Sequence, residues 1–254
     1  MSDQERLIQV WRATCEALQG VVRDLKVTQE ELLLAGRFFN RLGQSGMFPS
    51  ILNVGVGMTS VDVHRVPGSG TRPNMLGPFY KPGAPVREDG NLIETSVTPD
   101  TRLLYLDGVV SDATSGKPLA GVELDFWQAD NSGVYDHGGF NLCGVIRTDE
   151  HGRYSMKTVV PRDYSDHDND PIGELFRAMG RHNRRAAHLH LKVRAAGYVP
   201  LITQIFMPDS DYLDSDYVEG AVSADLTLTY RPHAGDNGNS VDSTFDLSLQ
   251  RLPT

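Results

Sequence analysis

The chain has 254 residues, of which 39% are hydrophobic and 22% are charged, and its formal net charge is −9. A chain of this length can bury a substantial core, so we expect one main domain with an appendage. The negative charge argues against a nucleic-acid partner and against a polybasic membrane contact, because both need clustered Lys and Arg. Small molecules and other proteins remain as partners.

The amino-terminal residues show no targeting signal. They lack a basic stretch followed by an apolar run, and no apolar segment in the chain approaches the roughly 18 residues that span a bilayer. We therefore expect a cytoplasmic protein with no membrane contact. The two cysteines, Cys15 and Cys143, match no zinc spacing, so we expect ordinary packing and no disulfide.

Three apolar patterns near the start of the chain predict helices. Apolar residues recur every three or four positions over residues 4–19, with Gly20 close to the expected end. Residues 28–31 form a capping box for a second helix that should end at Gly43. The piece at 51–58 is interrupted by glycines and should be helical only at its start.

These short helices cannot form a large core alone, so they should pack on the rest of the chain, on a second copy, or on both. Frequent glycine and proline without periodicity at 67–85 indicate a crossing segment. We predict a small helical N-terminal domain at residues 1–66, which would mediate dimerisation. A second domain should cover 67–254 and begin with the crossing segment at 67–100.

Beyond residue 100 the apolar pattern has a period of two, which is typical of strands. Turn residues separate these runs, and few helical patterns lie between them. We therefore expect a mainly β fold, an antiparallel β-sandwich, with one helical insertion at 172–179. The expected strands cover residues 103–110, 122–127, 153–160, 187–195, 199–206, 222–230 and 244–251.

Two histidines, His188 and His190, lie one residue apart in the strand expected at 187–195. Side chains alternate between the two faces of a strand, so both imidazoles face the same side and could bind one metal ion. For the pair alone, a solvated polar face is an equally good interpretation.

Two tyrosines lie just beyond expected strand ends. Tyr135 follows the strand that ends near Gln128, and Tyr164 follows the strand that ends near Val160. Loops at such positions commonly present functional groups, although a single tyrosine there usually has a packing role. The tyrosines become informative together with the histidines and the surrounding motifs.

Motifs spread over roughly residues 25–230 occur in a familiar order. They are Gly77-Pro78-Phe79-Tyr80, GxVxD at 108–112, GVELDFWQAD at 121–130, GxYD at 133–136, RTDxxGxY at 147–154, Gly180-Arg181-His182, RxxHxH at 185–190 and Thr203-Gln204-Ile205. In this order they resemble the intradiol ring-cleaving dioxygenases. The helical N-terminal part makes the chain most similar to the catechol and hydroxyquinol 1,2-dioxygenase branch, and it implies that the β-sandwich is the catalytic domain.

The resemblance implies one non-haem Fe(III) per chain, bound by Tyr135, Tyr164, His188 and His190. The donor chemistry agrees with this implication. Ferric iron is a hard cation that favours anionic oxygen, and two phenolates offset two of its three charges. Neutral imidazoles complete the set.

The resemblance also implies a reaction. A catechol-type substrate (hydroxyquinol, catechol or a substituted catechol) would be cleaved with O2 between its two hydroxyl-bearing carbons to give a muconate-type diacid. Tyr164 would leave the metal and take up a substrate proton, Arg185 would stabilise negative charge on the substrate, and Gln204 would orient a ligand or the oxygen site. Relatives are dimers whose interface can carry a bound lipid, so we expect a homodimer through the N-terminal helices.

Two departures from the family pattern bear on the substrate. Ala186 replaces a usual proline, which should be tolerated. After Tyr164, where relatives are commonly apolar, this chain has Asp166, His167 and Asp168. If these polar side chains border the substrate site, they favour a hydroxylated ring. An equally good interpretation is that they face water and do not contact the substrate. The other residues expected by position to contact substrate are Met75, Leu76, Pro78 and Phe79.

Two other functions stay open from the sequence alone. Residues 108–126 also resemble transthyretin-like or carboxypeptidase regulatory β-sandwich modules, which bind without metal, but this interpretation leaves the tyrosines and histidines unexplained. A zinc or copper enzyme would use the histidine pair, and the two tyrosines disfavour it. Colour separates these cases, because tyrosinate bound to Fe(III) makes a protein red to burgundy, whereas a regulatory module or a zinc site is colourless.

Overall fold

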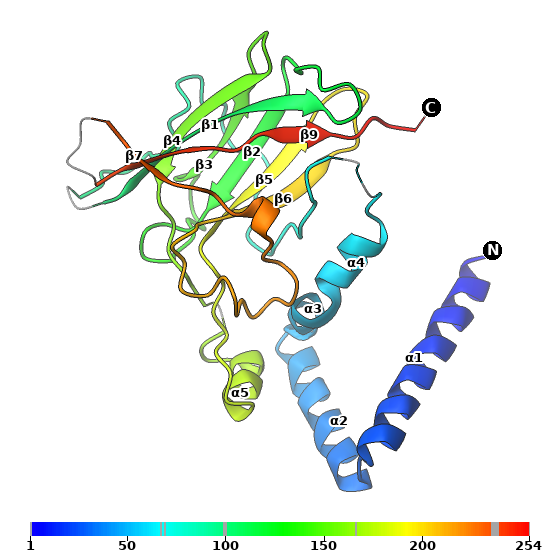
Figure 1. Ribbon diagram of the computed structural model, residues 1–254. Helices are drawn as coiled ribbons and strands as arrows, with labels where there is room; N and C mark the ends of the chain where they lie inside the picture. Colours follow the sequence, from blue (N-terminus) through cyan, green and yellow to red (C-terminus); the bar gives the residue numbers. More distant parts are fainter. Residues whose placement is uncertain are drawn as a thin grey trace.

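The computed structural model describes residues 2–66, 68, 70–98, 101–165, 167–234 and 239–253. The strands gather at one end of the molecule and the N-terminal helices at the other (Figure 1). In the part of the chain that is described, no helix is both long enough and apolar enough to cross a bilayer.

The first two helices are α1 (Asp3–Leu25) and α2 (Gln29–Gln44). The capping box of α2 is confirmed: the backbone N–H of Glu31 donates to the hydroxyl of Thr28 over 3.2 Å, and the N–H of Thr28 donates to the carboxylate of Glu31 over 2.7 Å. Helix α1 is longer than predicted, because it continues through Gly20 and ends only where Lys26 adopts a left-handed conformation.

The expectation of a short third helix was wrong. Helix α3 (Phe48–Leu52) continues as a π-helix, η1 (Asn53–Gly57), and then as α4 (Met58–Val63). Gly57 does not end the helix but lets the crossing segment come close, since a Cβ there would lie 2.3 Å from the sulfur of Met75. Glycine in this helix therefore has a packing reason.

The first sheet has the order β4-β1-β8-β7, and β9 also pairs with β1. The antiparallel pairing expected from the sequence occurs between β1 and β4 and between β7 and β8, whereas β1 pairs parallel with both β8 and β9. The strands are β1 (Leu103–Asp112), β4 (Arg153–Val159), β7 (Arg231–Pro232), β8 (Val241–Thr244) and β9 (Leu247–Leu249).

The second sheet has the order β3-β2-β5-β6, and all its pairings are antiparallel. Its register places His190 opposite Trp127 on one neighbouring strand and opposite Gln204 on the other. The strands are β2 (Glu123–Gln128), β3 (Cys143–Arg147), β5 (His188–Arg194) and β6 (Leu201–Phe206).

One expected strand is absent, and one expected helix is present. At 222–230 the described chain forms a 3₁₀ turn, η2 (Ala224–Leu226), and makes only an isolated bridge to β6. The alternating apolar residues there are buried as core packing without joining a sheet. The predicted insertion is confirmed as α5 (Pro171–Ala178), whose N-cap Asp170 accepts bonds from two backbone N–H groups.

The helices and the sandwich share one hydrophobic core. Leu42, Val54 and Met58 from the helical part lie in the same buried cluster as Leu104 of β1 and Leu124 of β2. The fold is therefore a β-sandwich with a small helical part, as predicted. The division into domains at residues 66 and 67 stays a prediction.

Candidate active site

Four side chains predicted as metal ligands come together at one end of the second sheet. Tyr135, Tyr164, His188 and His190 are all buried, each with at most 7% of its surface exposed. The two phenol oxygens lie 3.5 Å apart, and the Nε2 atoms of the two histidines lie 3.1 Å apart.

Strand β5 presents both histidines on the same side. Leu189 and Leu191 point into the sandwich core, so His188 and His190 point away from it. The tyrosine loop at Tyr164 is fixed to the segment just before this strand by a pair of backbone hydrogen bonds with Arg185, of 3.3 and 2.8 Å.

Two glycines allow the close approach that the site requires. Gly133, with φ +82°, belongs to the loop of Tyr135 and packs on the other tyrosine loop, where a Cβ on it would come within 2.9 Å of the Cβ of Tyr164. Gly77, with φ +75°, packs on His190, and a Cβ there would come within 2.8 Å of Cε1 of this ring. Only glycine combines these backbone angles with this lack of bulk.

The surroundings of the histidines favour neutral imidazoles. Burial lowers the pKa of both rings well below the usual value, and the charge of Arg185 lowers the pKa of each further. The Nδ1 atom of His188 lies 2.6 Å from the carbonyl oxygen of Ala186, which can only accept, so this nitrogen carries the proton. Nε2 of His188 is then unprotonated, and its lone pair can bind a metal ion.

His190 is held by packing. Its ring stacks on Trp127 with the centroids 4.9 Å apart and an interplanar angle of 2°. Its Nδ1 atom is buried without a hydrogen-bond partner among the described residues. Nε2 of His190 can donate to His188, or both Nε2 atoms can direct their lone pairs at one cation.

The donor set fits a hard, highly charged metal ion. Two phenol oxygens and two neutral imidazoles converge, and a buried cation there would be balanced by phenolate charge. In the described part of the chain, no group of three or more His, Cys, Asp and Glu side chains is placed to hold a metal. A metal at this place therefore depends on the tyrosines, which disfavours a typical zinc site.

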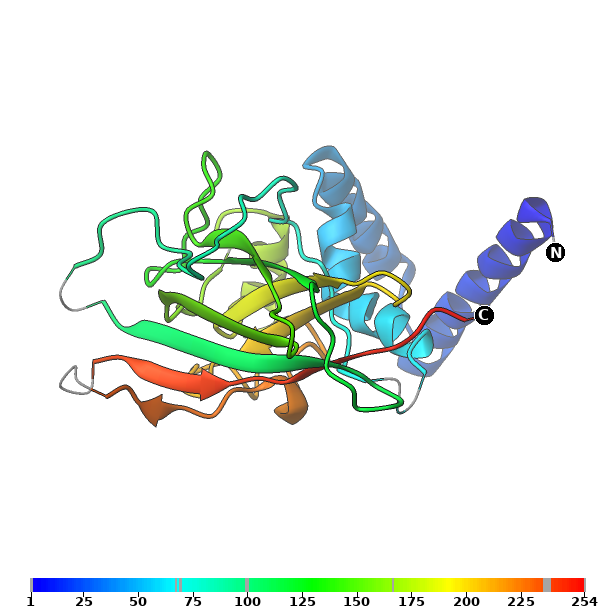
Figure 2. The ribbon, with the colours of Figure 1, turned by 90° about the horizontal axis from the view of Figure 1, so that it is seen from above.

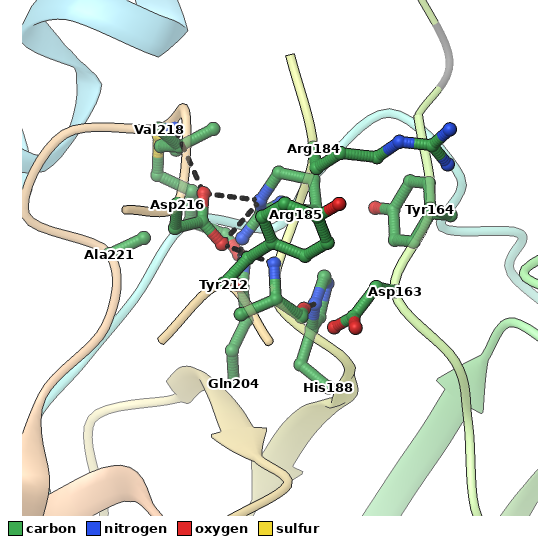
Figure 3. Close-up of polar contacts among 12 residues, drawn as sticks. Asp163, Tyr164, Arg184, Arg185, His188, Gln204, Tyr212, Asp216, Val218 and Ala221 are labelled. Atoms are coloured by element: carbon green, nitrogen blue, oxygen red, sulfur yellow. Dashed lines mark hydrogen bonds and ion pairs between the residues drawn. The ribbon is translucent and has the colours of Figure 1, made fainter. Parts of the chain in front are cut away.

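Arg185 lies beside the tyrosine and histidine cluster and is buried. Its Nη2 donates to Oε1 of Gln204 over 2.7 Å, and its Nε donates to Asp216 over 2.9 Å (Figure 3). Burial alone would lower the pKa of Arg185, but several neighbours oppose it, first among them the charge of Asp216, and together they raise this pKa above its usual value. The guanidinium is thus permanently charged.

A small cavity of about 60 Å³ lies next to this guanidinium. Met75, Pro78 and His167, three of the residues predicted to contact substrate, line it. Leu76 and Phe79 instead pack around the tyrosines, and the Phe79 ring lies 4.4 Å from that of Tyr135. Asp166 lies outside the described residues. The remaining lining residues are Ser50, Asn53, Val54, Gly77, Tyr164, Arg185, Gln204, Tyr217 and Val218.

Several of these residues were not anticipated from the sequence. Ser50 and Asn53 come from the helical part, for which no contact with the site was predicted. Asp216, Tyr217 and Val218 come from the loop after β6, which carries no motif. Nothing in their local sequence indicates that the fold brings them to the site.

A larger hollow of about 310 Å³ lies between α4, the start of β6 and the C-terminal strand. Its lining includes His64 and Arg65 but none of the four predicted ligands. The converging donors and the buried guanidinium make the smaller cavity the candidate active site.

The family model Dioxygenase_C, described as Dioxygenase, matches residues 75–251. A hydroxyquinol 1,2-dioxygenase of Rhizobium sp. (strain MTP-10005) is 36% identical over 86% of this chain and 77% of the relative. The chain belongs to the intradiol ring-cleaving dioxygenase family. A chlorocatechol 1,2-dioxygenase of Pseudomonas sp. (strain P51) is 30% identical, over 98% of this dioxygenase and 99% of the relative.

Solved structures agree with this assignment. The crystal structure of a hydroxyquinol 1,2-dioxygenase from Pseudomonas putida DLL-E4 matches with a TM-score of 0.89 and 29% identity, over 99% of this chain and 94% of that one. A 3-chlorocatechol 1,2-dioxygenase from Rhodococcus opacus 1CP matches with a TM-score of 0.86 and 29% identity, over 98% and 100%. This intradiol dioxygenase is therefore an enzyme, and the regulatory-module interpretation is rejected.

Proposed function

We propose that this dioxygenase cleaves hydroxyquinol, or another catechol with a polar substituent, between the two hydroxyl-bearing carbons. Both atoms of O2 would enter the muconate-type product. The observation that carries the proposal is the convergence of two buried phenols and two neutral imidazoles beside a cavity with a buried guanidinium.

Tyr135, Tyr164, His188 and His190 would hold one Fe(III) per chain. When bound, ferric iron supplies a Lewis acid that favours the doubly deprotonated form of two adjacent ring hydroxyls. The phenolate oxygen of Tyr164, whose side chain lines the cavity, would accept a proton from a substrate hydroxyl.

Arg185 would stabilise negative charge that develops on the substrate ring. Its guanidinium lines the cavity, is buried and keeps its charge, so its field is little screened by water. Gln204 would orient this guanidinium, because its Oε1 accepts from Nη2 while its Nε2 donates to the carbonyl of Met75 over 2.9 Å.

The preference for a polar ring rests on a polar wall of the cavity, formed by His167, Ser50 and Asn53. His167 is only 6% exposed and lines the cavity, and its Nδ1 lies 2.5 Å from the carboxylate of Asp170. Ser50 and Asn53 add polar groups to the same wall. A site that hydrogen-bonds a substrate hydroxyl rejects the analogue without it, because buried polar groups are then left unpaired.

The names of the relatives support the reaction class more than the substrate. A catechol 1,2-dioxygenase of Candida albicans is 36% identical over 82% of this chain, as close as the Rhizobium hydroxyquinol enzyme. A 6-chlorohydroxyquinol 1,2-dioxygenase of Cupriavidus pinatubonensis is 32% identical. Our choice of hydroxyquinol over catechol as the preferred substrate therefore rests on the polar wall of the cavity and not on these relatives.

Steady-state kinetics with catechol, hydroxyquinol, an alkylcatechol and a chlorocatechol test the proposal. We expect kcat/KM to be highest for hydroxyquinol and low for the alkylated and chlorinated rings. A preference for plain or chlorinated catechol would contradict the polar-wall proposal. If none of the four rings is cleaved by the iron-loaded protein, the proposed reaction itself is wrong.

The variant His167→Leu tests the wall directly. We expect it to reduce the preference for hydroxyquinol over catechol, because the hydroxyl loses a polar neighbour. His233→Leu is a matched control, since His233 also pairs with a carboxylate, Asp242, at 2.6 Å, but lies on the first sheet beside Tyr105. An equal change in both variants would show that the effect is not local.

We further propose that the N-terminal helices form a homodimer interface, which can carry a bound lipid. Helix α1 extends away from the sandwich in both views (Figures 1 and 2). It has no buried residue, although the structure describes all of it. Its exposed apolar side chains include Leu7, Trp11, Leu18 and Leu25.

A further inference from the structure

Asp216 is the buried counter-ion of Arg185. Nε of the guanidinium lies 2.9 and 3.1 Å from the two carboxylate oxygens, and the side chains are only 5% and 3% exposed. Removing one partner of such a pair leaves an uncompensated buried charge, which is strongly unfavourable. The position of this guanidinium is therefore coupled to the position of Asp216.

The carboxylate is itself fixed by backbone groups. The N–H of Ala186 donates to Oδ2 over 2.9 Å, and the N–H of Val218 donates to Oδ1 over 2.8 Å (Figure 3). Ala186 lies two residues before β5, whereas Val218 belongs to the loop after β6. Asp216 thus joins two segments that are about 30 residues apart along the chain.

Gln204 holds the other end of the guanidinium. Its Oε1 accepts from Nη2 over 2.7 Å, so contacts at both ends fix the plane of the group. A guanidinium has five N–H donors, and these contacts account for the one on Nε and one on Nη2. Since Arg185 lines the cavity, N–H groups remain for a ligand there.

We propose that Asp216 is a positioning residue of the ring-cleavage reaction, which fixes the guanidinium of Arg185 at the cavity. By the same contacts it seats its neighbours Tyr217 and Val218 on the cavity wall. The inference rests on the proposed function, because it assumes that Arg185 acts on the substrate. Asp216 acts through Arg185 and does not touch the substrate itself.

The variant Asp216→Asn, in the full-length iron-loaded protein, tests this role. The amide keeps the size of the side chain but removes its charge and one acceptor oxygen. We expect kcat on the best catechol-type substrate to fall on the order of 10- to 100-fold, with a smaller change in KM. Iron content and the visible tyrosinate band should stay as in the wild type, which a general loss of structure would not allow.

A double-mutant cycle separates positioning from a merely structural role. If Asp216 acts through Arg185, then adding Asp216→Asn to Arg185→Gln should lower kcat by less than about twofold further. A full additional loss in the Arg185→Gln background would overturn the proposal, as would an unchanged kcat in Asp216→Asn alone. If the Asn variant does not fold, Asp216→Glu, which keeps the charge, is used in the same cycle with the same criteria.

Asp209→Asn is the matched control. Asp209 lies in the same loop and forms an ion pair with Arg102, but both side chains of this pair are well exposed. We expect no change in kcat for this variant. The wild-type activity is measured first, so that failure of the proposed function, which would show as no turnover at all, is distinct from failure of the role of Asp216.

Discussion

The candidate site depends on single atoms whose protonation the surroundings decide. The carbonyl of Ala186 fixes the proton of His188 on Nδ1, and burial keeps both imidazoles neutral. The guanidinium of Arg185, in contrast, keeps its charge because Asp216 is beside it. A neutral ligand pair next to a permanent cation is suited to an anionic ligand.

Arg185 should act on charge and not on the metal. For Arg185→Lys and Arg185→Ala we expect iron and colour to be retained, with transition-state stabilisation reduced by about 2–4 kcal/mol in kcat/KM. Lysine keeps the charge but not the planar fork that contacts Asp216 and Gln204. Iron-free variants would show that the residue is structural.

Gly77 should control how well His190 is placed. In Gly77→Ala the new Cβ would meet the imidazole at 2.8 Å, so we expect faster loss of iron to a chelator. Gly83→Ala is the control, because Gly83 also has a positive φ, of +91°, but nothing lies within 4 Å of its Cβ position. The backbone strain of about 1 kcal/mol is then common to both. Equal iron loss would contradict the role of the close contact.

At the scale of elements, features that depend on neighbouring residues could be predicted from the sequence better than the pairing of strands. The capping box of α2 and the insertion at α5 depend on adjacent residues, and both were found. The strand expected at 222–230 has the right alternation, but it meets β6 in a single isolated bridge and does not pair further, so its apolar side chains pack directly on the core. The short β7 (Arg231–Pro232) has no pattern of its own to predict it.

Asp112 ties the end of β1 to two distant segments. Its carboxylate accepts from the hydroxyl of Tyr198 over 2.8 Å and from Nε of Arg251 over 2.6 Å. The pKa of Asp112 lies below its ordinary value near 3.8. The hydrogen bond from the backbone N–H of Ser115 lowers this pKa most, and the bond from the hydroxyl of Tyr198 lowers it next. The charged form therefore favours the folded state.

The sign of the pH effect follows from this lowered pKa. The unfolded chain takes up the proton of Asp112 near pH 3.8, before the folded chain does, so the stabilisation is present above that pH and is lost below it. We expect Asp112→Asn to have a lower free energy of unfolding than the wild type at pH 6. Urea unfolding should show this difference narrowing as the pH falls below 3.8, and a constant or widening difference would argue against the assignment.

At the scale of the whole molecule, α1 is a long helix whose apolar side chains stay exposed in the single chain. Trp11 is 67% exposed and Leu25 is 73% exposed. We expect a dimer in light scattering, and Leu18→Glu should shift the mass towards the monomer because it places a charge in the apolar contact. Arg12→Glu, a charge change elsewhere on the same helix, should leave the mass unchanged. A monomeric wild type would contradict the proposed interface.

The composition of the site shows what a sequence can and cannot predict. Tyr135, Tyr164, His188 and His190 lie in motifs, so their convergence could be expected from the order of those motifs. Asn53 and Asp216 reach the site through packing between a helix, a strand and a loop that are far apart along the chain. Such long-range contacts leave no periodic or local signal.

The iron content per chain of the wild type and of two single variants, His188→Ala and His190→Ala, tests the central claim most directly. After reconstitution with iron we predict one ion per wild-type chain, with the red to burgundy absorption of tyrosinate bound to Fe(III). Both variants should lose the iron, the colour and the activity. A colourless, iron-free wild type, or full iron occupancy in both variants, would contradict the proposed ligand set.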